Sequence, residues 1–137
     1  MSDGGKLVGI VLVSHSAQVA ASVAEMAKDL AGAGRAVPVA PAGGTQDGGL
    51  GTSADLVAAA ASSVDRGAGV AVLADLGSAV LTVKALLTEV DELPKDTRLV
   101  DAPFVEGAVA AVVTASTGAD LAAVAASAEE AYTYRKT

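Results

Sequence analysis

Residues 7–16, LVGIVLVSHS, contain seven apolar or glycine residues followed by a histidine that lies between two serines. The run from Leu7 to Val13 is short, continuous and rich in β-branched residues, which is typical of a strand buried on both faces of a sheet. From about Ser16 the hydrophobic period changes to that of a helix. We therefore expect a buried strand that ends just before Ser14 and His15 and turns at once into a helix.

The rest of the chain repeats this alternation of strand and helix. Later strands are predicted at 36–40, 69–74 and 98–100, and the segments 52–55 (TSAD) and 117–120 (TGAD) resemble helix capping boxes with Thr52 and Thr117 as caps. The first helix is expected to end at Gly32 and Gly34. Its predicted core face carries Val19, Val23, Met26, Ala27 and Leu30. The apolar residues of the third helix are Val80, Leu81, Val83, Leu87 and Val90.

The order of elements, β-α-β-α-β-α-β-α-α, predicts the fold class. Short apolar strands that alternate with amphipathic helices favour an α/β, doubly wound, flavodoxin-like sheet of four parallel strands in the order 2-1-3-4, with helices on both faces. Pro38 lies inside the second predicted strand and has no N–H group to donate, so that strand belongs at an edge, in agreement with this order. At 137 residues, we expect residues 1–137 to form one domain.

The composition excludes several functional classes. The net charge of −7 argues against nucleic-acid binding, which needs basic residues to neutralise phosphates, and permits a basic protein partner. Cysteine is absent, which excludes thiol chemistry and zinc–thiolate sites. No apolar run reaches membrane-spanning length, and residues 1–16 lack the pattern of a signal peptide. We therefore expect a cytoplasmic protein with no membrane partner.

The predicted strand order brings the only histidine close to a carboxylate. Ligands of such sheets bind beyond the carboxyl ends of the strands where the order reverses, here between strands 1 and 3. His15 follows the first strand and Asp75 the third. A carboxylate that accepts from one ring nitrogen leaves the other nitrogen as a nucleophile, and the start of the next helix favours an anion there. Ser14 and Ser16 add hydroxyl donors, so we expect a phosphorylated histidine.

A purely structural interpretation stands beside this one at the level of spacing. A lone histidine at a helix start can satisfy backbone groups, and an aspartate after a strand is often a turn residue. Other chemistries lack their parts: no Gly-x-Ser-x-Gly elbow is present, and the glycine-rich loop at 43–51 has no lysine for a phosphate-binding loop. Histidines and carboxylates are too few or too scattered for a metal centre. We expect neither a metal nor a cofactor.

Four segments together carry a resemblance to a known family. They are residues 11–16 (VLVSHS), 51–55 (GTSAD), 73–79 (LADLGSA) and 102–107 (APFVEG), in family order and at family-like spacing. The chain resembles the phosphoryl-donor subunit of the phosphoenolpyruvate-dependent dihydroxyacetone kinase, which is related to the IIA domains of mannose-type sugar phosphotransferase systems. Mannose-type domains tend to have Thr-His-Gly and a Gly-Gly-Ser-Pro turn. The pieces here, 14–16 (SHS) and 77–79 (GSA), favour the dihydroxyacetone branch.

The resemblance implies a phosphotransferase role and assigns the site residues. His15 is then the phosphorylated residue, with the phosphoryl group on its tele nitrogen, and Asp75 orients its ring. The phosphoryl group comes from the phosphocarrier protein HPr and passes to ADP held on the nucleotide-binding subunit of the kinase, beside a third, dihydroxyacetone-binding subunit. The residues implied to line the phosphoryl site are Ser14, Ser16, Gly51, Thr52, Gly77 and Ser78. Glu106 lies in a matching segment without an assigned role.

Family members are typically homodimers, and the alanine-rich final helices are candidate dimer surfaces. Two alternatives stay open at this point. One is a IIA component of a mannose-type sugar transporter that passes the phosphoryl group to a histidine of a IIB protein. The other is a noncatalytic flavodoxin-like module that binds an anion or regulates a partner.

Overall fold

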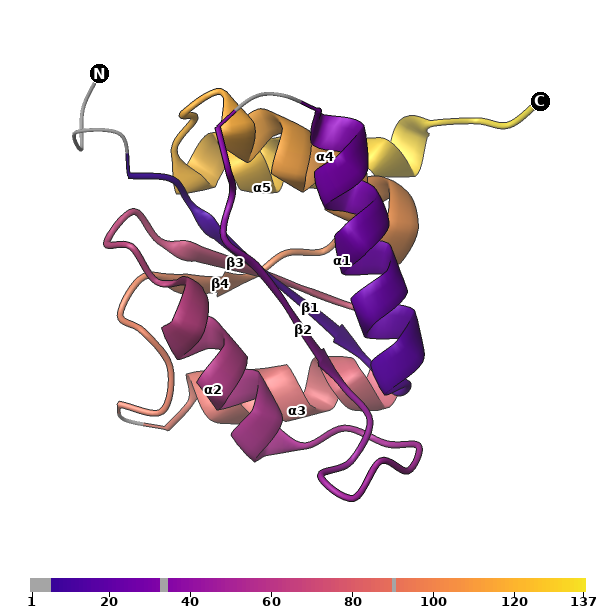
Figure 1. Cartoon of the computed structure of the whole chain (residues 1–137), viewed down its shortest axis with the longest axis vertical. Helices are drawn as coiled ribbons and strands as arrows, with labels where there is room; N and C mark the ends of the chain where they lie inside the picture. The colour runs from indigo at the N-terminus through magenta and orange to yellow at the C-terminus, as the bar shows by residue number, and fades with distance from the viewer. Residues whose placement is uncertain (1–5, 33–34, 90) are drawn as a thin grey trace.

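A computed structural model describes residues 6–32, 35–89 and 91–137. Within these ranges the chain forms a parallel sheet of four strands in the order β2-β1-β3-β4, drawn across the centre of Figure 1. The strands are β1 (Gly9–Ser14), β2 (Val39–Gly43), β3 (Val70–Ala74) and β4 (Thr97–Leu99). The predicted α/β fold and its strand order 2-1-3-4 are therefore confirmed.

Helices cover both faces of this sheet. They are α1 (Ala17–Ala31), α2 (Ala54–Val64), α3 (Gly77–Leu87), α4 (Phe104–Ser116) and α5 (Leu121–Glu130), followed by a 3₁₀ turn at Ala131–Thr133. Helices α2 and α3 pack on one face, and α1, α4 and α5 pack on the other (Figure 1). None of the helices in the described ranges is long and apolar enough to cross a bilayer.

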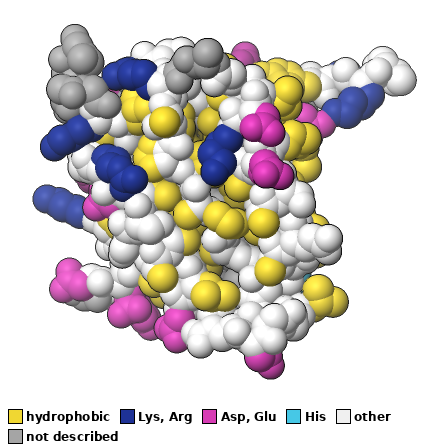
Figure 2. Space-filling model, viewed as in Figure 1, with side chains coloured by type: hydrophobic (Ala, Val, Ile, Leu, Met, Phe, Trp, Pro, Cys, Tyr) yellow, Lys and Arg dark blue, Asp and Glu magenta, His cyan; other side chains and the backbone are white. Residues whose placement is uncertain are grey.

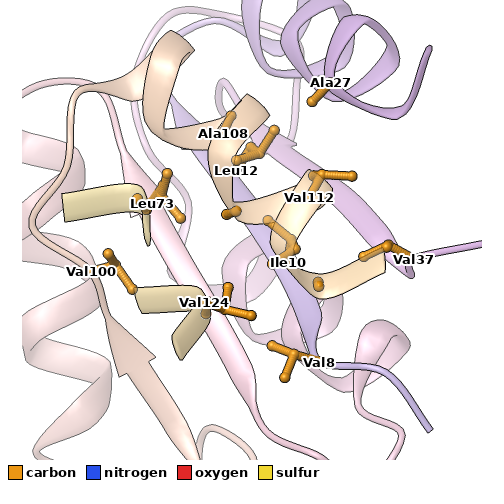
Figure 3. Packing of buried hydrophobic residues seen from close by; sticks show 14 of the residues in the cluster. Val8, Ile10, Leu12, Ala27, Val37, Leu73, Val100, Ala108, Val112 and Val124 are labelled. Carbon is orange, nitrogen blue, oxygen red and sulfur yellow. The ribbon is translucent and has the colours of Figure 1, made fainter. Parts of the chain in front are cut away.

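Strand β1 is the centre of both hydrophobic cores. All six of its residues are buried, because it lies between β2 and β3 with helices above and below. Ile10 and Leu12 point into the core beneath α1, α4 and α5, where Figure 3 shows them beside Val112 and Val124. Val11 and Val13 point into the other core, under α2 and α3. Burial of each such side chain stabilises the fold by roughly 1.5–3 kcal/mol.

The second strand lies three residues later than the sequence predicts. It was expected at 36–40 and runs from Val39 to Gly43. Pro38 precedes the strand, and its carbonyl oxygen accepts from the Ile10 amide at 2.9 Å. Pro41 lies within the strand and is exposed, which the free side of an edge strand allows. The edge position predicted from Pro38 is thus correct, although the boundary is not.

Two predicted helix caps are wrong by one and three residues. Helix α2 is capped by Ser53, whose hydroxyl accepts from the Leu56 amide, instead of by Thr52. Helix α5 is capped by Asp120, whose carboxylate accepts from the Ala123 amide, instead of by Thr117. Serine and aspartate both cap well, so the pattern alone does not choose between neighbouring candidates. The predicted roles of Gly34 and Val90 lie outside the described residues.

The predicted core face of the first helix is rotated in the structure. Val19, Met26 and Leu30 were expected inside, but their side chains are 43%, 39% and 62% exposed. The buried positions of α1 include Ala20 and Ala24. Small side chains allow α1 to approach the sheet and α4 closely, so alanines occupy the contact and larger residues stay outside. Leu81 and Leu87 of α3 are likewise exposed, at 68% and 40%.

A glycine in β1 allows α2 to approach the sheet. A methyl group added at Gly9 would lie 2.3 Å from the carbonyl oxygen of Val64, at the end of α2. We predict that Gly9→Ala lowers the free energy of unfolding by about 1–3 kcal/mol, because strand or helix must shift to relieve the contact. Urea unfolding followed by circular dichroism measures this change.

Gly77→Ala is the matched control for that prediction. Position 77 lies in the first turn of α3, and an added methyl group there has no neighbour within 4 Å. The same substitution should therefore be neutral or stabilise by up to about 1 kcal/mol, since alanine restricts the unfolded chain. Equal unfolding midpoints for Gly9→Ala and the wild type would contradict the proposed close contact.

Candidate active site

The site lies at the carboxyl ends of the two central strands. Strands β1 and β3 pair in parallel, and their register sets Val13 opposite Ala74. His15 and Asp75 follow these strand ends, so their backbones lie side by side. The Nδ1 atom of His15 is 3.1 Å from Oδ1 of Asp75. The structure thus brings together the two residues that strand order predicts to converge.

The Asp75 carboxylate accepts hydrogen bonds on both of its oxygens. Oδ1 accepts from the Leu76 amide at 2.7 Å and faces His15 Nδ1. Oδ2 accepts from the Ser14 hydroxyl at 2.7 Å and from the His15 amide at 3.2 Å. Burial by itself raises the pKa of Asp75, but the hydrogen bonds from Ser14, His15 and Leu76 outweigh it, and this pKa lies below its ordinary value of 3.8.

This carboxylate sets the tautomer of the His15 ring. An ionised carboxylate only accepts hydrogen bonds, so Nδ1 of a neutral ring must carry the proton. The lone pair then lies on Nε2, which contacts the Ser78 hydroxyl at the start of α3. The side chain of His15 is 26% exposed, against 15% for Asp75. Nε2 is therefore the ring nitrogen that can act as a nucleophile, and Asp75 is hydrogen-bonded to the other ring nitrogen, on the less exposed side.

The two serines beside His15 have other partners. Ser14 is fully buried, donates to Asp75 and accepts from the Ser16 amide at 3.1 Å. The Ser16 hydroxyl caps α1 by accepting from the Val19 amide at 3.2 Å. Both hydroxyls are engaged with Asp75 or with the helix backbone. The sequence-based assignment of Ser14 and Ser16 as hydrogen-bond donors to a phosphoryl group stays a prediction, and in this structure both hydroxyls have these other partners.

The loop after β2 fixes the backbone of His15. The Gly51 amide donates to the His15 carbonyl oxygen at 2.9 Å, and the Gly44 amide donates to the Ser14 carbonyl oxygen at 3.2 Å. The Thr52 hydroxyl is buried without a hydrogen-bond partner, and Thr52 forms a backbone bridge with Gly44. Gly51 and Thr52 therefore lie at the rim of the site. The Gly51 amide is already hydrogen-bonded to the His15 carbonyl oxygen.

The start of α3 is open. The cap residue of this helix, Leu76, offers no side-chain acceptor, whereas α1, α2 and α5 each have a side-chain cap. The amides of Gly77 and Ser78 belong to the first turn, which has no hydrogen-bond partner within the helix. The Ser78 hydroxyl contacts Nε2, and these two amides belong to the same turn. Together they offer a place for an anion beside the nucleophile.

A cavity of about 540 Å³ adjoins the site on the side of β4. Asp75, Lys84, Asp101, Phe104 and Tyr132 are among its lining residues, and the Tyr132 hydroxyl donates to Asp101 at 2.8 Å. Sequence patterns do not predict this cavity, because its walls come from separate elements. Glu106, which had no assigned role, forms an ion pair with Lys136.

The described residues contain no cluster of three or more potential metal ligands of the types His, Cys, Asp and Glu.

A family comparison covers most of the chain. Residues 9–125 match the model of the EIIA-man family, described as the PTS system fructose IIA component. The chain belongs to the EIIA-man family. The matched range contains the strands, His15, Asp75 and the start of α3, so it includes the site described above.

Several relatives of the chain are phosphoryl donor subunits named DhaM. The subunit of the PEP-dependent dihydroxyacetone kinase 2 of Listeria innocua is 37% identical over 108 residues, which are 78% of this chain and 85% of the relative. The DhaM subunit of Escherichia coli is 37% identical over 118 residues, which are 84% of this chain but 25% of that protein. This EIIA-man chain is thus similar to DhaM subunits and matches about a quarter of the longer one.

Solved structures agree with the fold. The crystal structure of the unknown-function protein EF1359 has a TM-score of 0.78 and 33% identity, covering 92% of this chain and 95% of that one. A sigma-54 interaction domain protein from Enterococcus faecalis has a TM-score of 0.68 at 17% identity, covering 95% of this chain and 93% of that one. The second likeness concerns the fold of the EIIA-man chain alone.

The Asp75 carboxylate ties the stability of this EIIA-man chain to pH. Because its pKa is lower in the folded than in the unfolded state, the stabilisation is fully present above the ordinary value of 3.8 and is lost as pH falls through the lower folded value. We predict that Asp75→Asn makes the urea midpoint less dependent on pH below about 4. Equal slopes for variant and wild type between pH 2.5 and 5 would contradict this prediction.

Proposed function

We propose that this chain is a phosphohistidine carrier that supplies phosphoryl groups to a dihydroxyacetone kinase. The observation that carries the proposal is the pairing of His15 Nδ1 with Asp75 Oδ1 at 3.1 Å, with Nε2 directed to the open start of α3. Membership of the EIIA-man family and 31–39% identity to DhaM subunits support the phosphotransferase role at a coarse level. The finer steps below are part of the same proposal.

In the first step, the Nε2 lone pair attacks the phosphorus atom of a phosphohistidine on the donor protein HPr. The bond from phosphorus to Nε2 forms as the bond to the donor nitrogen breaks, and that electron pair returns to the donor ring. Because Nδ1 keeps its proton, the phosphorylated His15 ring becomes positively charged. The neighbouring Asp75 carboxylate stabilises this charge. The product is the tele-phosphohistidine.

In the second step, an oxygen of the terminal phosphate of ADP attacks the phosphoryl group. ADP is held on the nucleotide-binding subunit of the kinase, and the product ATP serves the dihydroxyacetone-binding subunit. The electron pair of the broken bond returns to Nε2 and restores the neutral ring. Because Nδ1 of the phosphorylated ring stays protonated, the leaving group is a neutral imidazole, which departs readily. Asp75 accepts from this Nδ1–H group in both steps. The Ser78 hydroxyl and the amides of Gly77 and Ser78 receive the phosphoryl oxygens between the steps.

Charge near the site supports a basic protein as the phosphoryl donor. The net charge of the chain is −7. Acidic side chains lie along the lower edge of the face drawn in Figure 2, where Figure 1 draws the segment between α3 and β4, the start of α2 and the loop after β2. Asp47 lies in that loop and Asp55 in the first turn of α2, and both are exposed. Opposite charges raise the rate at which protein partners meet in the correct orientation.

Phosphoryl transfer from radiolabelled phosphoenolpyruvate tests the carrier function. With enzyme I and HPr, we predict acid-labile label on the wild type and none on His15→Ala, because the variant has no nucleophile. Addition of the ADP-loaded kinase subunit should then remove the label and produce ATP.

Two controls are needed to interpret a missing label. A circular dichroism spectrum of His15→Ala shows whether the variant is folded, and a known IIA protein shows whether the donor mixture is active. An unlabelled wild type beside a labelled control would overturn the carrier function. Label that stays with ADP present but passes to a IIB protein would move the acceptor to a sugar transporter.

We also propose that the chain forms a homodimer through an apolar groove between α1 and α4. The groove has a volume of about 460 Å³. Its apolar lining includes Met26, Leu30, Val105, Val109, Val113 and Tyr134. Leu30 is 62% exposed and Tyr134 50%, which is unusual for large apolar side chains grouped on one surface. A second copy of the chain covers this surface, and α4 supplies one wall, as expected for the final helices.

Sedimentation measurements test the dimer. We predict that Leu30→Glu converts the dimer to a monomer at micromolar concentration, since a buried unpaired charge at an interface is costly. Leu50→Glu is the matched control, because Leu50 is 82% exposed and lies in the loop after β2, outside the groove. A monomeric wild type, or equal association of the two variants, would contradict the proposal.

A further inference from the structure

The proposed reaction steps assign no role to Ser14, a buried polar residue at the end of β1. Among the described residues it is the one polar or charged residue that is buried as a whole, with no exposed surface. A hydroxyl removed from water costs free energy unless it is hydrogen-bonded. The partners of Ser14 therefore indicate why a hydroxyl stands at the end of a strand that is otherwise apolar.

The hydroxyl of Ser14 joins two parts of the site. It accepts from the Ser16 amide at 3.1 Å, at the start of α1, and donates to Asp75 Oδ2 at 2.7 Å. Asp75 in turn contacts His15 Nδ1 through its other oxygen at 3.1 Å. An unbroken chain of hydrogen bonds thus runs from the start of α1, through Ser14 and Asp75, to the ring of His15. Each bond in such a chain polarises the next one.

The position of Ser14 fixes the plane of the carboxylate. Oδ1 is held by the Leu76 amide at 2.7 Å, and Oδ2 is held by Ser14 at 2.7 Å. The His15 amide also donates to Oδ2, but at the longer distance of 3.2 Å. Two short bonds on opposite oxygens prevent rotation about the bond to the carboxyl group. Without the Ser14 bond, Oδ2 keeps only the longer bond from the His15 amide, and the carboxylate is held less firmly in the plane that faces Nδ1.

We propose that Ser14 is a positioning residue, which holds Asp75 in the orientation that keeps the proton of His15 on Nδ1 and the lone pair on Nε2. This proposal rests on the phosphohistidine carrier function proposed above. It gives the buried serine a role different from that of a hydrogen-bond donor to the phosphoryl group. Ser14 contacts neither the ring nor the place of the phosphoryl group, and it acts through Asp75.

The expected effect is on the His15 tautomer before any phosphoryl group arrives. In the wild type, ¹⁵N NMR should show a protonated Nδ1 and an unprotonated Nε2 when the ring is neutral. In Ser14→Ala, both tautomers should be populated, because the looser carboxylate no longer selects one. Phosphoryl transfer from HPr should slow by about tenfold, the rate equivalent of one hydrogen bond to a charged acceptor, and its pH profile should shift.

A pair of variants of equal shape isolates the hydroxyl. Ser14→Thr keeps the donor and Ser14→Val removes it, whereas both add bulk at the buried position. Ser14→Thr should therefore retain the wild-type tautomer and transfer rate more closely than Ser14→Val. If neither variant folds, Ser14→Ala against the wild type decides the question. A unique Nδ1–H tautomer and an unchanged rate in Ser14→Ala would overturn the proposal.

Asp120→Ala is the control for lost stability. It removes the side-chain cap of α5, which begins beside Gly69 at the amino end of β3, the end of the sheet opposite to Asp75. Its unfolding midpoint should fall while the His15 tautomer and the transfer rate stay as in the wild type. A slower transfer in this control equal to that of Ser14→Ala would assign the Ser14 effect to stability and overturn the proposal.

The NMR measurement separates this proposal from the carrier function. It uses the unphosphorylated chain and needs no partner protein. A changed tautomer in Ser14→Ala together with a wild type that takes no label would support the positioning role and overturn the carrier function. An unchanged tautomer in Ser14→Ala together with normal labelling of the wild type would overturn the positioning role and support the carrier function.

Discussion

The parallel pairing of β1 with β3 is the constraint on which the rest of the structure depends. The register sets Val13 opposite Ala74, so the carboxyl ends of the two strands lie within one residue of each other. The next residues in each chain segment are then neighbours, and these include His15 and Asp75. A shift of one residue would reverse the faces of β1, because side chains alternate along a strand. The burial of Ile10 and Leu12 on one face and of Val11 and Val13 on the other thus also fixes the geometry of the site.

The strand order and the meeting of His15 with Asp75 follow from the sequence for a physical reason. Apolar runs with β-branched residues identify buried strands, Pro38 identifies the edge, and right-handed crossovers leave few arrangements. What the sequence does not predict are features decided by packing distance. The alanines of α1 fit against α4 while Met26 and Leu30 stay exposed, because close approach of backbones outweighs the burial of larger side chains there.

Sequence patterns also do not predict which hydrogen-bond partner a polar side chain finds. Ser53 and Thr52 are adjacent, and either suits a cap, but only Ser53 reaches the Leu56 amide. Ser14 and Ser16 look alike beside His15, yet one is the last residue of a buried strand and the other starts a helix. Burial at the end of β1 is the signal that separates them. A hydroxyl at the end of a fully buried strand needs an internal acceptor, and Asp75 on the neighbouring strand end supplies it.

The two helix starts at the site divide the hydrogen bonding between them. At the start of α1, Ser16 caps the helix, and the nearby Gly51 amide donates to the His15 carbonyl oxygen, so these groups fix the backbone. At the start of α3, Leu76 leaves the first-turn amides without a side-chain acceptor. In the proposed carrier, the start of α3 would receive a phosphoryl group on Nε2, while the hydrogen bonds of Ser14 and Asp75 connect the ring to the start of α1. The two helix starts therefore differ in a way that fits the proposed function: the hydrogen bonds of Ser14 and Ser16 are all used within the chain, whereas the first turn of α3 has no side-chain acceptor.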